Sequence, residues 1–82
     1  MGGLWIKFTS PGMTGVPDRI AIFPGGVIVF VEVKTESGRI SPVQEHVIRK
    51  LRDRGCHVHV VRGESGALGF INYMRMVLEG RR

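Results

Sequence analysis

The segment from Val27 to Lys34 reads Val-Ile-Val-Phe-Val-Glu-Val-Lys. β-branched and aromatic residues dominate it, which predicts a strand, and an apolar residue at nearly every position is typical of a central strand covered on both faces. We expect the strand to continue to Thr35. Because side chains alternate along a strand, Glu32 and Lys34 project from the same face. A carboxylate and an amine at the end of an apolar strand indicate a polar site.

Three further strands are predicted around this segment. Arg19 to Phe23 is joined to it by a tight turn at Pro24-Gly25-Gly26, which predicts an antiparallel hairpin. Leu4 to Thr9 is a strand or a short irregular arm, and residues 10–17 form a loop rich in Gly and Pro. His57 to Val61 is the fourth strand.

Two helices are predicted after the hairpin. Ser41 is the expected N-cap of the first, with Pro42 at the first helical position, and Gly55 is well placed to end it. Residues 63–66 are expected to be a loop, and the second helix to span Ala67 to Glu79. Because the first helix separates the third and fourth strands, a right-handed crossover would make those strands parallel. The apolar positions at helical spacing are Val43, Val47, Ile48 and Leu51 in the first helix, and Ala67, Ile71, Met74 and Leu78 in the second.

Together these elements predict a single α/β domain over residues 1–82, with a small mixed sheet of about four strands flanked by helices. The net charge of +5 and the pI of about 10.4 favour an anionic partner, with nucleic acid as the first candidate. A single cysteine, Cys56, excludes an intrachain disulfide and a cysteine-based zinc site. No apolar run is long enough for a membrane helix and no secretory signal is evident, so we expect a cytoplasmic protein without a membrane partner.

The hairpin also predicts a metal site. Asp18 and Glu32 lie about equally far from the turn, so antiparallel pairing would make the two carboxylates neighbours. Like charges this close are unfavourable unless a cation lies between them, and hard oxygen ligands favour Mg²⁺ or Mn²⁺. The carbonyl of Val33 is a candidate third ligand. Lys34 would stabilise charge developing on a phosphate, and Gln44 on the first helix is within reach of the site.

Simpler interpretations exist for each of these residues. Asp18 after a proline is also typical of a turn, and Glu32 with Lys34 is compatible with a solvated strand end. Gln44 three residues after Ser41 fits a capping box, which does not exclude a role in the site. Several basic residues should contact phosphates, with Arg39 as the first choice and Arg19 and Ser10 as further DNA-binding candidates.

Three motifs follow one another along the chain: Gly15-Val16-Pro17-Asp18-Arg19-Ile20, Glu32-Val33-Lys34-Thr35 and Gly38-Arg39-Ile40-Ser41-Pro42-Val43-Gln44. In this order they resemble the VRR-NUC family of the PD-(D/E)XK nuclease superfamily. Pro17-Asp18 is similar to the family's "PD" and Glu32-Val33-Lys34 to its "EXK". The resemblance covers about residues 8 to 65.

The resemblance implies a restriction-endonuclease-like core that hydrolyses DNA phosphodiester bonds with Mg²⁺ or Mn²⁺. By position, Asp18 and Glu32 would bind the metal through their carboxylates and Val33 through its carbonyl, Lys34 would be catalytic, and Gln44 would support the site. The superfamily core usually begins with a helix ahead of the first strand. Only nine residues precede Ser10 and none is acidic, so that helix is expected to be short or missing.

Short members of this family, from phages and bacteria, resemble dimeric endonucleases that act on branched DNA such as four-way (Holliday) junctions. A two-fold homodimer would present two sites with the symmetry of such a junction. The alternatives are a DNA-binding module with little or no catalysis, and a flap nuclease or exonuclease. Apolar candidates for a dimer interface are Leu4, Trp5, Ile6, Phe8, Phe70, Tyr73 and Met74.

Overall fold

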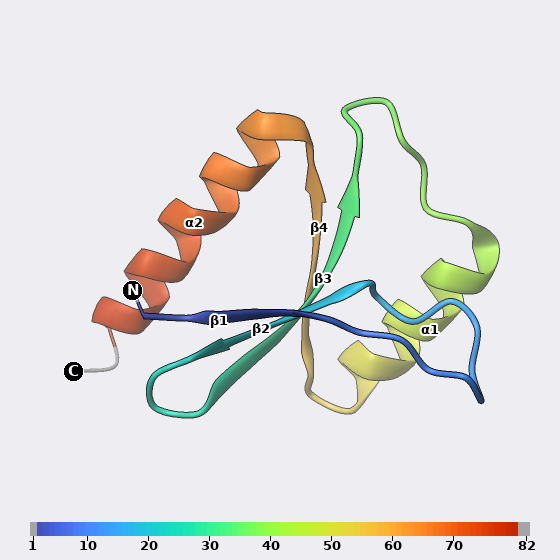
Figure 1. Cartoon of the computed structure of the whole chain (residues 1–82), viewed down its shortest axis with the longest axis horizontal. Helices are drawn as coiled ribbons and strands as arrows, with labels where there is room; N and C mark the ends of the chain where they lie inside the picture. The colour runs from blue at the N-terminus through green and yellow to red at the C-terminus, as the bar shows by residue number, and fades with distance from the viewer. Residues whose placement is uncertain (1, 81–82) are drawn as a thin grey trace.

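A twisted four-stranded sheet lies between two helices in the computed structural model, which describes residues 2–80 (Figure 1). The strand order is β1-β2-β3-β4; β2 is antiparallel to both β1 and β3, and β4 is parallel to β3. This confirms the predicted α/β class and the crossover. The elements are β1 (Leu4–Lys7), β2 (Arg19–Phe23), β3 (Val27–Lys34), α1 (Pro42–Asp53), β4 (His57–Arg62) and α2 (Gly63–Glu79).

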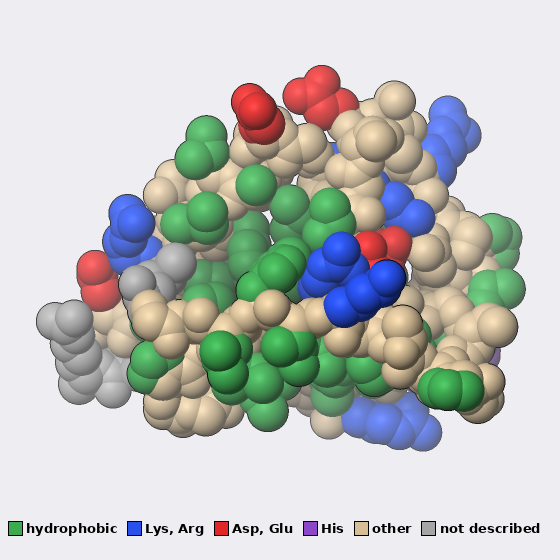
Figure 2. Space-filling model, in the orientation of Figure 1, with side chains coloured by type: hydrophobic (Ala, Val, Ile, Leu, Met, Phe, Trp, Pro, Cys, Tyr) green, Lys and Arg blue, Asp and Glu red, His purple; other side chains and the backbone are tan. Residues whose placement is uncertain are grey.

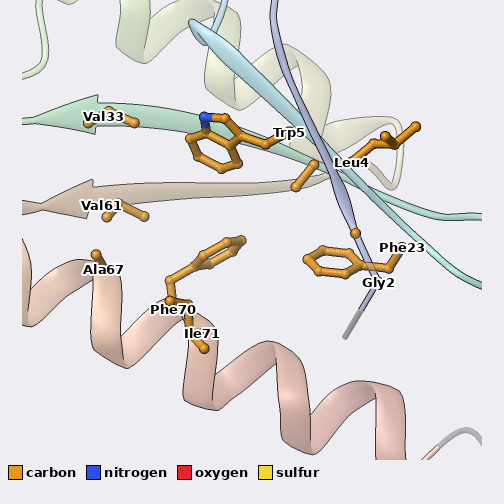
Figure 3. Close-up of a pocket in the computed structure, with 11 residues that line it drawn as sticks. Gly2, Leu4, Trp5, Phe23, Val33, Val61, Ala67, Phe70 and Ile71 are labelled. Atoms are coloured by element: carbon orange, nitrogen blue, oxygen red, sulfur yellow. The ribbon is translucent and has the colours of Figure 1, made fainter.

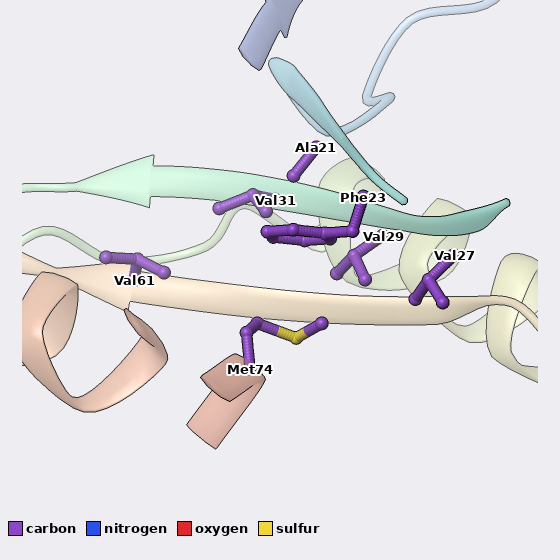
Figure 4. Close-up of a cluster of buried hydrophobic side chains, with 7 residues drawn as sticks. All are labelled: Ala21, Phe23, Val27, Val29, Val31, Val61 and Met74. Atoms are coloured by element: carbon purple, nitrogen blue, oxygen red, sulfur yellow. The ribbon is translucent and has the colours of Figure 1, made fainter. Parts of the chain in front are cut away.

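The two faces of β3 serve different purposes. Its residues with odd numbers, from Val27 to Val31, face α2 and belong to the buried core shown in Figure 4. Its residues with even numbers, including Glu32 and Lys34, lie on the face of α1. The strand alternation thus separates a hydrophobic face from a polar one. The core cluster consists of Ala21, Phe23, Val27, Val29, Val31, Val61 and Met74.

Two expectations about burial are wrong. Met74, also a candidate for an exposed interface, is only 2% exposed and packs in the core, as its place in the apolar stripe of the second helix predicts. The third strand is not covered on both faces throughout, because Ile28 is 49% exposed. Helix α1 packs against β4 and leaves the outer part of the β2–β3 hairpin open on that side.

The predicted loop at residues 63–66 is also wrong, since it forms the first turn of α2. Gly63 has a φ of +63° and changes the chain direction directly after β4, and a Cβ there would collide with the side chain of Glu36. Gly66 lies against the backbone of Val61. These glycines mark close packing rather than a loop.

The remaining boundaries agree with expectation to within one or two residues. The first strand is regular from Leu4 to Lys7, and no helix precedes it within the described residues. Gly55, with a φ of +84°, follows the end of α1 as predicted. No helix between residues 2 and 80 has the length and apolar character needed to cross a bilayer.

Candidate active site

The hairpin register brings the two predicted carboxylates together. Arg19, the first residue of β2, pairs with Val31, so the same register extended by one residue before β2 places Asp18 opposite Glu32. The backbone N–H of Asp18 donates to Glu32 Oε1 at 3.2 Å, and the N–H of Val33 donates to Asp18 Oδ1 at 3.1 Å. Each acid is therefore bound to the backbone beside the other one, which fixes both at the same end of the sheet.

The loop before β2 is held in place by packing that a sequence alone does not show. The N–H of Phe8 donates to the carbonyl of Asp18 at 2.9 Å, extending the β1–β2 pairing to the site. Pro17 is fully buried. Gly15, with a φ of +85°, lies so close to Val43 of α1 that a Cβ would approach its Cγ1 to 2.6 Å. This contact ties the loop that delivers Asp18 to the helix that delivers Gln44.

Glu32 is buried, with 3% of its surface exposed, and its charge is fully paired. Lys34 Nζ lies 3.1 Å from Glu32 Oε2, and Gln44 Nε2 donates to the same oxygen at 3.0 Å. Together with the Asp18 N–H, these bonds take up three of the roughly four lone-pair positions of a carboxylate. A buried carboxylate needs such partners, because its desolvation otherwise costs several kcal/mol, on the order of 3–5.

Gln44 makes both the capping-box contacts and a contact with the candidate site. Its backbone N–H donates to Ser41 Oγ at 3.1 Å, and its Oε1 accepts the Ser41 N–H at 2.9 Å, which completes the capping box. The other end of the same amide, Nε2, reaches Glu32. The helix cap therefore fixes the rotamer that supports the carboxylate.

The donor set fits a hard divalent cation. Among residues 2–80, Asp18 Oδ2 accepts no hydrogen bond and its one ion pair is with Arg19, at 3.9 Å; Glu32 Oε1 has lone-pair capacity left beside its single bond. Val33 adds a carbonyl oxygen at the same strand end. No group of three or more His, Cys, Asp or Glu side chains that could hold a metal occurs in residues 2–80. Two carboxylates with waters and a substrate phosphate are typical of Mg²⁺ rather than of zinc.

Of the three predicted DNA contacts, only Arg19 joins this cluster. Its guanidinium donates to the carbonyl of Asp18 at 2.9 Å. Arg39 is exposed in the loop between β3 and α1, and Ser10 is half-buried in the loop before β2. Within the described part of the chain, no hydrogen bond links either one to Asp18, Glu32, Lys34 or Gln44.

One basic residue beside the site was not singled out from the sequence. Arg62 pairs with Lys34 in the parallel register, and its Nε donates to the carbonyl of Gly38 at 3.1 Å. The predicted fourth strand ended one residue too early, at Val61; extending the alternation by one position would have placed Arg62 beside Lys34. On the face shown in Figure 2, acidic atoms lie beside Lys and Arg atoms and next to a hydrophobic hollow.

Comparison with known proteins agrees with this geometry. The VRR-NUC domain model matches residues 4–65, which include all four strands, α1 and the clustered site residues. The chain belongs to the VRR-NUC family. It is 48% identical over 65 residues to "Putative nuclease p44" of Acyrthosiphon pisum secondary endosymbiont phage 1, covering 79% of this chain and 70% of that protein.

A solved structure described as a VRR_NUC domain superposes with a TM-score of 0.81 at 39% identity, covering 87% of this chain and 77% of the other. The small mixed sheet with its two helices is therefore a VRR-NUC fold, and the protein is a nuclease by family. The family match ends at residue 65, so most of α2 lies beyond it.

Proposed function

We propose that this VRR-NUC protein is a Mg²⁺- or Mn²⁺-dependent DNA endonuclease that cuts branched DNA, such as four-way junctions. One observation carries the proposal: Asp18 and Glu32 hold each other at one sheet end, with Lys34 Nζ 3.1 Å from Glu32 Oε2. Acids and an amine in this arrangement suit phosphodiester hydrolysis.

Each residue has a separate task in this scheme. Asp18 and Glu32 would hold the cation through their carboxylates, and Val33 through its carbonyl. When bound, such an ion neutralises a phosphate oxygen and makes a bound water more acidic. Lys34 stabilises the negative charge that grows on the phosphate as the bond breaks. Gln44 keeps the Glu32 carboxylate in its rotamer.

The protein's charge supports a nucleic-acid substrate. The net charge of +5 is consistent with binding through phosphates, and such binding weakens as salt displaces the contacts. Arg19 lies at the site itself, and we propose that Arg39 and Ser10 contact the flanking backbone. Arg62, next to Lys34 on the neighbouring strand, is a further cation at the same end of the sheet.

A homodimer is part of the proposal, because one site cuts one strand and a junction needs two symmetric cuts. Leu4, Ile6 and Ile28 are 64%, 43% and 49% exposed and share the sheet face that α1 leaves open. This uncharged surface on an edge of the sheet suits contact between two copies. We place the activity in the cytoplasm, either of a bacterium that encodes the protein or of the host of a phage that does.

A cleavage assay tests the function directly. A labelled four-way junction, a flap and a linear duplex are incubated with the protein and Mg²⁺ or Mn²⁺, with EDTA as a control. We expect paired nicks in the junction, lost with EDTA and in Lys34→Ala. Glu45→Gln is the matched control, since Glu45 is the neighbour of Gln44 on α1 but pairs with Arg49 in solvent, and it should cleave like the parent.

The other outcomes separate the alternatives. Binding that depends on salt, but not on metal or on Asp18→Asn, without any cleavage, would identify a DNA-binding module. Stepwise trimming of one strand by a monomer in size-exclusion chromatography would identify a flap nuclease or exonuclease. Intact junction, flap and duplex in both metals would refute the endonuclease.

A further inference from the structure

A cavity of about 390 Å³ opens between β1 and α2, on the opposite side of the sheet from α1. Trp5 reaches into it from β1 and Phe70 from α2, as Figure 3 shows, with Val33 and Val61 near one end and Phe23 near the other. Trp5 is 52% exposed, and within residues 2–80 no aromatic ring pairs with it. A large exposed aromatic on an edge strand is an informative feature of a small soluble domain.

The cavity is connected to the candidate active site through one residue. The backbone N–H of Val33 donates to Asp18 Oδ1, while the side chain of Val33 lines the cavity. A group bound against the Val33 side chain is therefore separated from Asp18 by the backbone of β3.

Two cations, Lys7 and Arg19, lie on the same sheet face as Trp5, towards the strand end that carries Asp18. Lys7 follows Trp5 by two residues on β1, so both side chains point to the same face, about 7 Å apart along the strand. Lys7 pairs with Arg19, whose guanidinium contacts Asp18. From the cavity towards this end of the sheet, the chain thus offers an aromatic platform at Trp5, the two positive charges of Lys7 and Arg19, and then Asp18, while Glu32 is buried on the face of α1.

We propose that this cavity binds one unstacked nucleobase of the DNA strand that is cut, stacked on Trp5 and Phe70, with the adjoining phosphate on Lys7 and Arg19. This rests on the proposed nuclease function and explains a preference for branched DNA. A base at a branch point is already partly unstacked, whereas a base within a duplex must first be extruded, at a cost of a few kcal/mol. Stacking on an aromatic ring is tolerant of base identity.

Charge favours a nucleic acid over a second copy of this chain as the occupant. The anionic backbone of DNA complements Lys7 and Arg19, whereas the same face of a second copy would bring its own Lys7 and Arg19 to this rim. Three residues that line the cavity, Ala67, Phe70 and Ile71, lie on α2 beyond residue 65, where the family match ends, whereas Trp5 lies within the matched region.

Trp5 is the only tryptophan in the sequence, so its fluorescence reports on the cavity directly. Cleavage-deficient Lys34→Ala protein is titrated with a four-way junction and with a linear duplex of the same length. We expect strong quenching by the junction and little by the duplex. In the same background, Trp5→Ala should bind the junction about 5- to 100-fold more weakly, as expected for the loss of one stacked base. Trp5→Phe should retain most of the affinity.

Tyr73→Ala is the matched control, since Tyr73 is a half-exposed aromatic on α2 that does not line this cavity, and its junction affinity should not change. Equal affinity of Trp5→Ala and its parent, or equal quenching by junction and duplex, would overturn the base site while leaving the nuclease intact. A Trp5→Ala protein that changes from dimer to monomer in size-exclusion chromatography would assign the cavity to a second copy and overturn it too. Failure of the parent protein to bind or cut any DNA would overturn the nuclease proposal and the base site with it.

Discussion

Removing either partner of the Glu32–Lys34 ion pair should destabilise the protein, but by unequal amounts. The Glu32 side chain is 4% exposed and the Lys34 side chain 20% exposed. In Lys34→Met, the carboxylate keeps its bonds from Gln44 and from the Asp18 N–H but loses its counter-charge, and it cannot reach water. Breaking a buried pair in this way costs about 3–5 kcal/mol, and the two remaining bonds reduce the expected loss to about 2–4 kcal/mol.

Glu32→Gln should cost less. The Lys34 side chain is partly exposed, so its unpaired ammonium can reach water. The remaining loss of stability comes mainly from the new amide group, which lies next to the hydrogen-bond donors of Lys34 and Gln44. We expect about 1–2 kcal/mol. The double variant should be less destabilised than the sum of the single ones, with a coupling of about 1–2 kcal/mol, because neither charge is then left alone.

Thermal unfolding followed by circular dichroism in EDTA measures these differences, since each kcal/mol corresponds to about 4–8 °C in Tm for a domain of this size. Added Mg²⁺ or Mn²⁺ should raise the Tm of Lys34→Met, whose Glu32 carboxylate is free to bind the ion, more than that of Glu32→Gln. A larger loss in Glu32→Gln than in Lys34→Met, or a coupling near zero, would refute the view that burial of Glu32 controls this pair.

Three further predictions concern the parts that surround the site. Gly15→Ala should lower the free energy of unfolding by about 2–4 kcal/mol and impair cleavage, because it places a Cβ at a φ of +85° against Val43; a variant as stable as the parent would contradict this packing. Ser41→Ala should cost about 1 kcal/mol through the lost cap, measured by urea unfolding, whereas Ser41→Asp should recover most of it. Burial of His59, with the nearby positive charges of Arg52 and His57, lowers the pKa of its imidazole from the usual 6.5. The unfolded chain then binds the proton more readily, so stability is full above about pH 6.5 and falls as the pH drops through the lowered pKa. His59→Gln should flatten this dependence in a series of Tm measurements from pH 8 to 5, and an unchanged pH profile would assign it to other groups.

The fold and the centre of the site could be predicted from the sequence because local rules govern them. The Pro24-Gly25-Gly26 turn sets the hairpin register, and that register alone brings Asp18 and Glu32 together. The Ser41 cap and Pro42 set the phase of α1, which turns Gln44 towards the sheet. The metal, its ligands and the role of Lys34 stay predictions.

The features that were missed depend on contacts between distant segments. Gly63 was interpreted as part of a loop, because nothing in its surroundings in the sequence shows that it packs on Glu36. Met74 was both a member of the apolar stripe and a candidate for an exposed interface, because an apolar residue on a helix does not reveal which face the sheet covers; it is buried under β3 and β4. Arg62 lies beside Lys34 only through the parallel pairing of two strands separated by a helix.

The alternation of core residues and site residues along β3 limits how this protein can evolve. Substitutions at the buried valines of β3 should change folding, whereas substitutions at Glu32 and Lys34 on the opposite face should change the chemistry. An insertion or deletion of one residue within β3 would exchange the two sets, directing Glu32 into the hydrophobic layer and a valine towards α1. Variation in length should therefore be confined to the loops, and the spacing between the turn and Lys34 should be invariant among functional relatives.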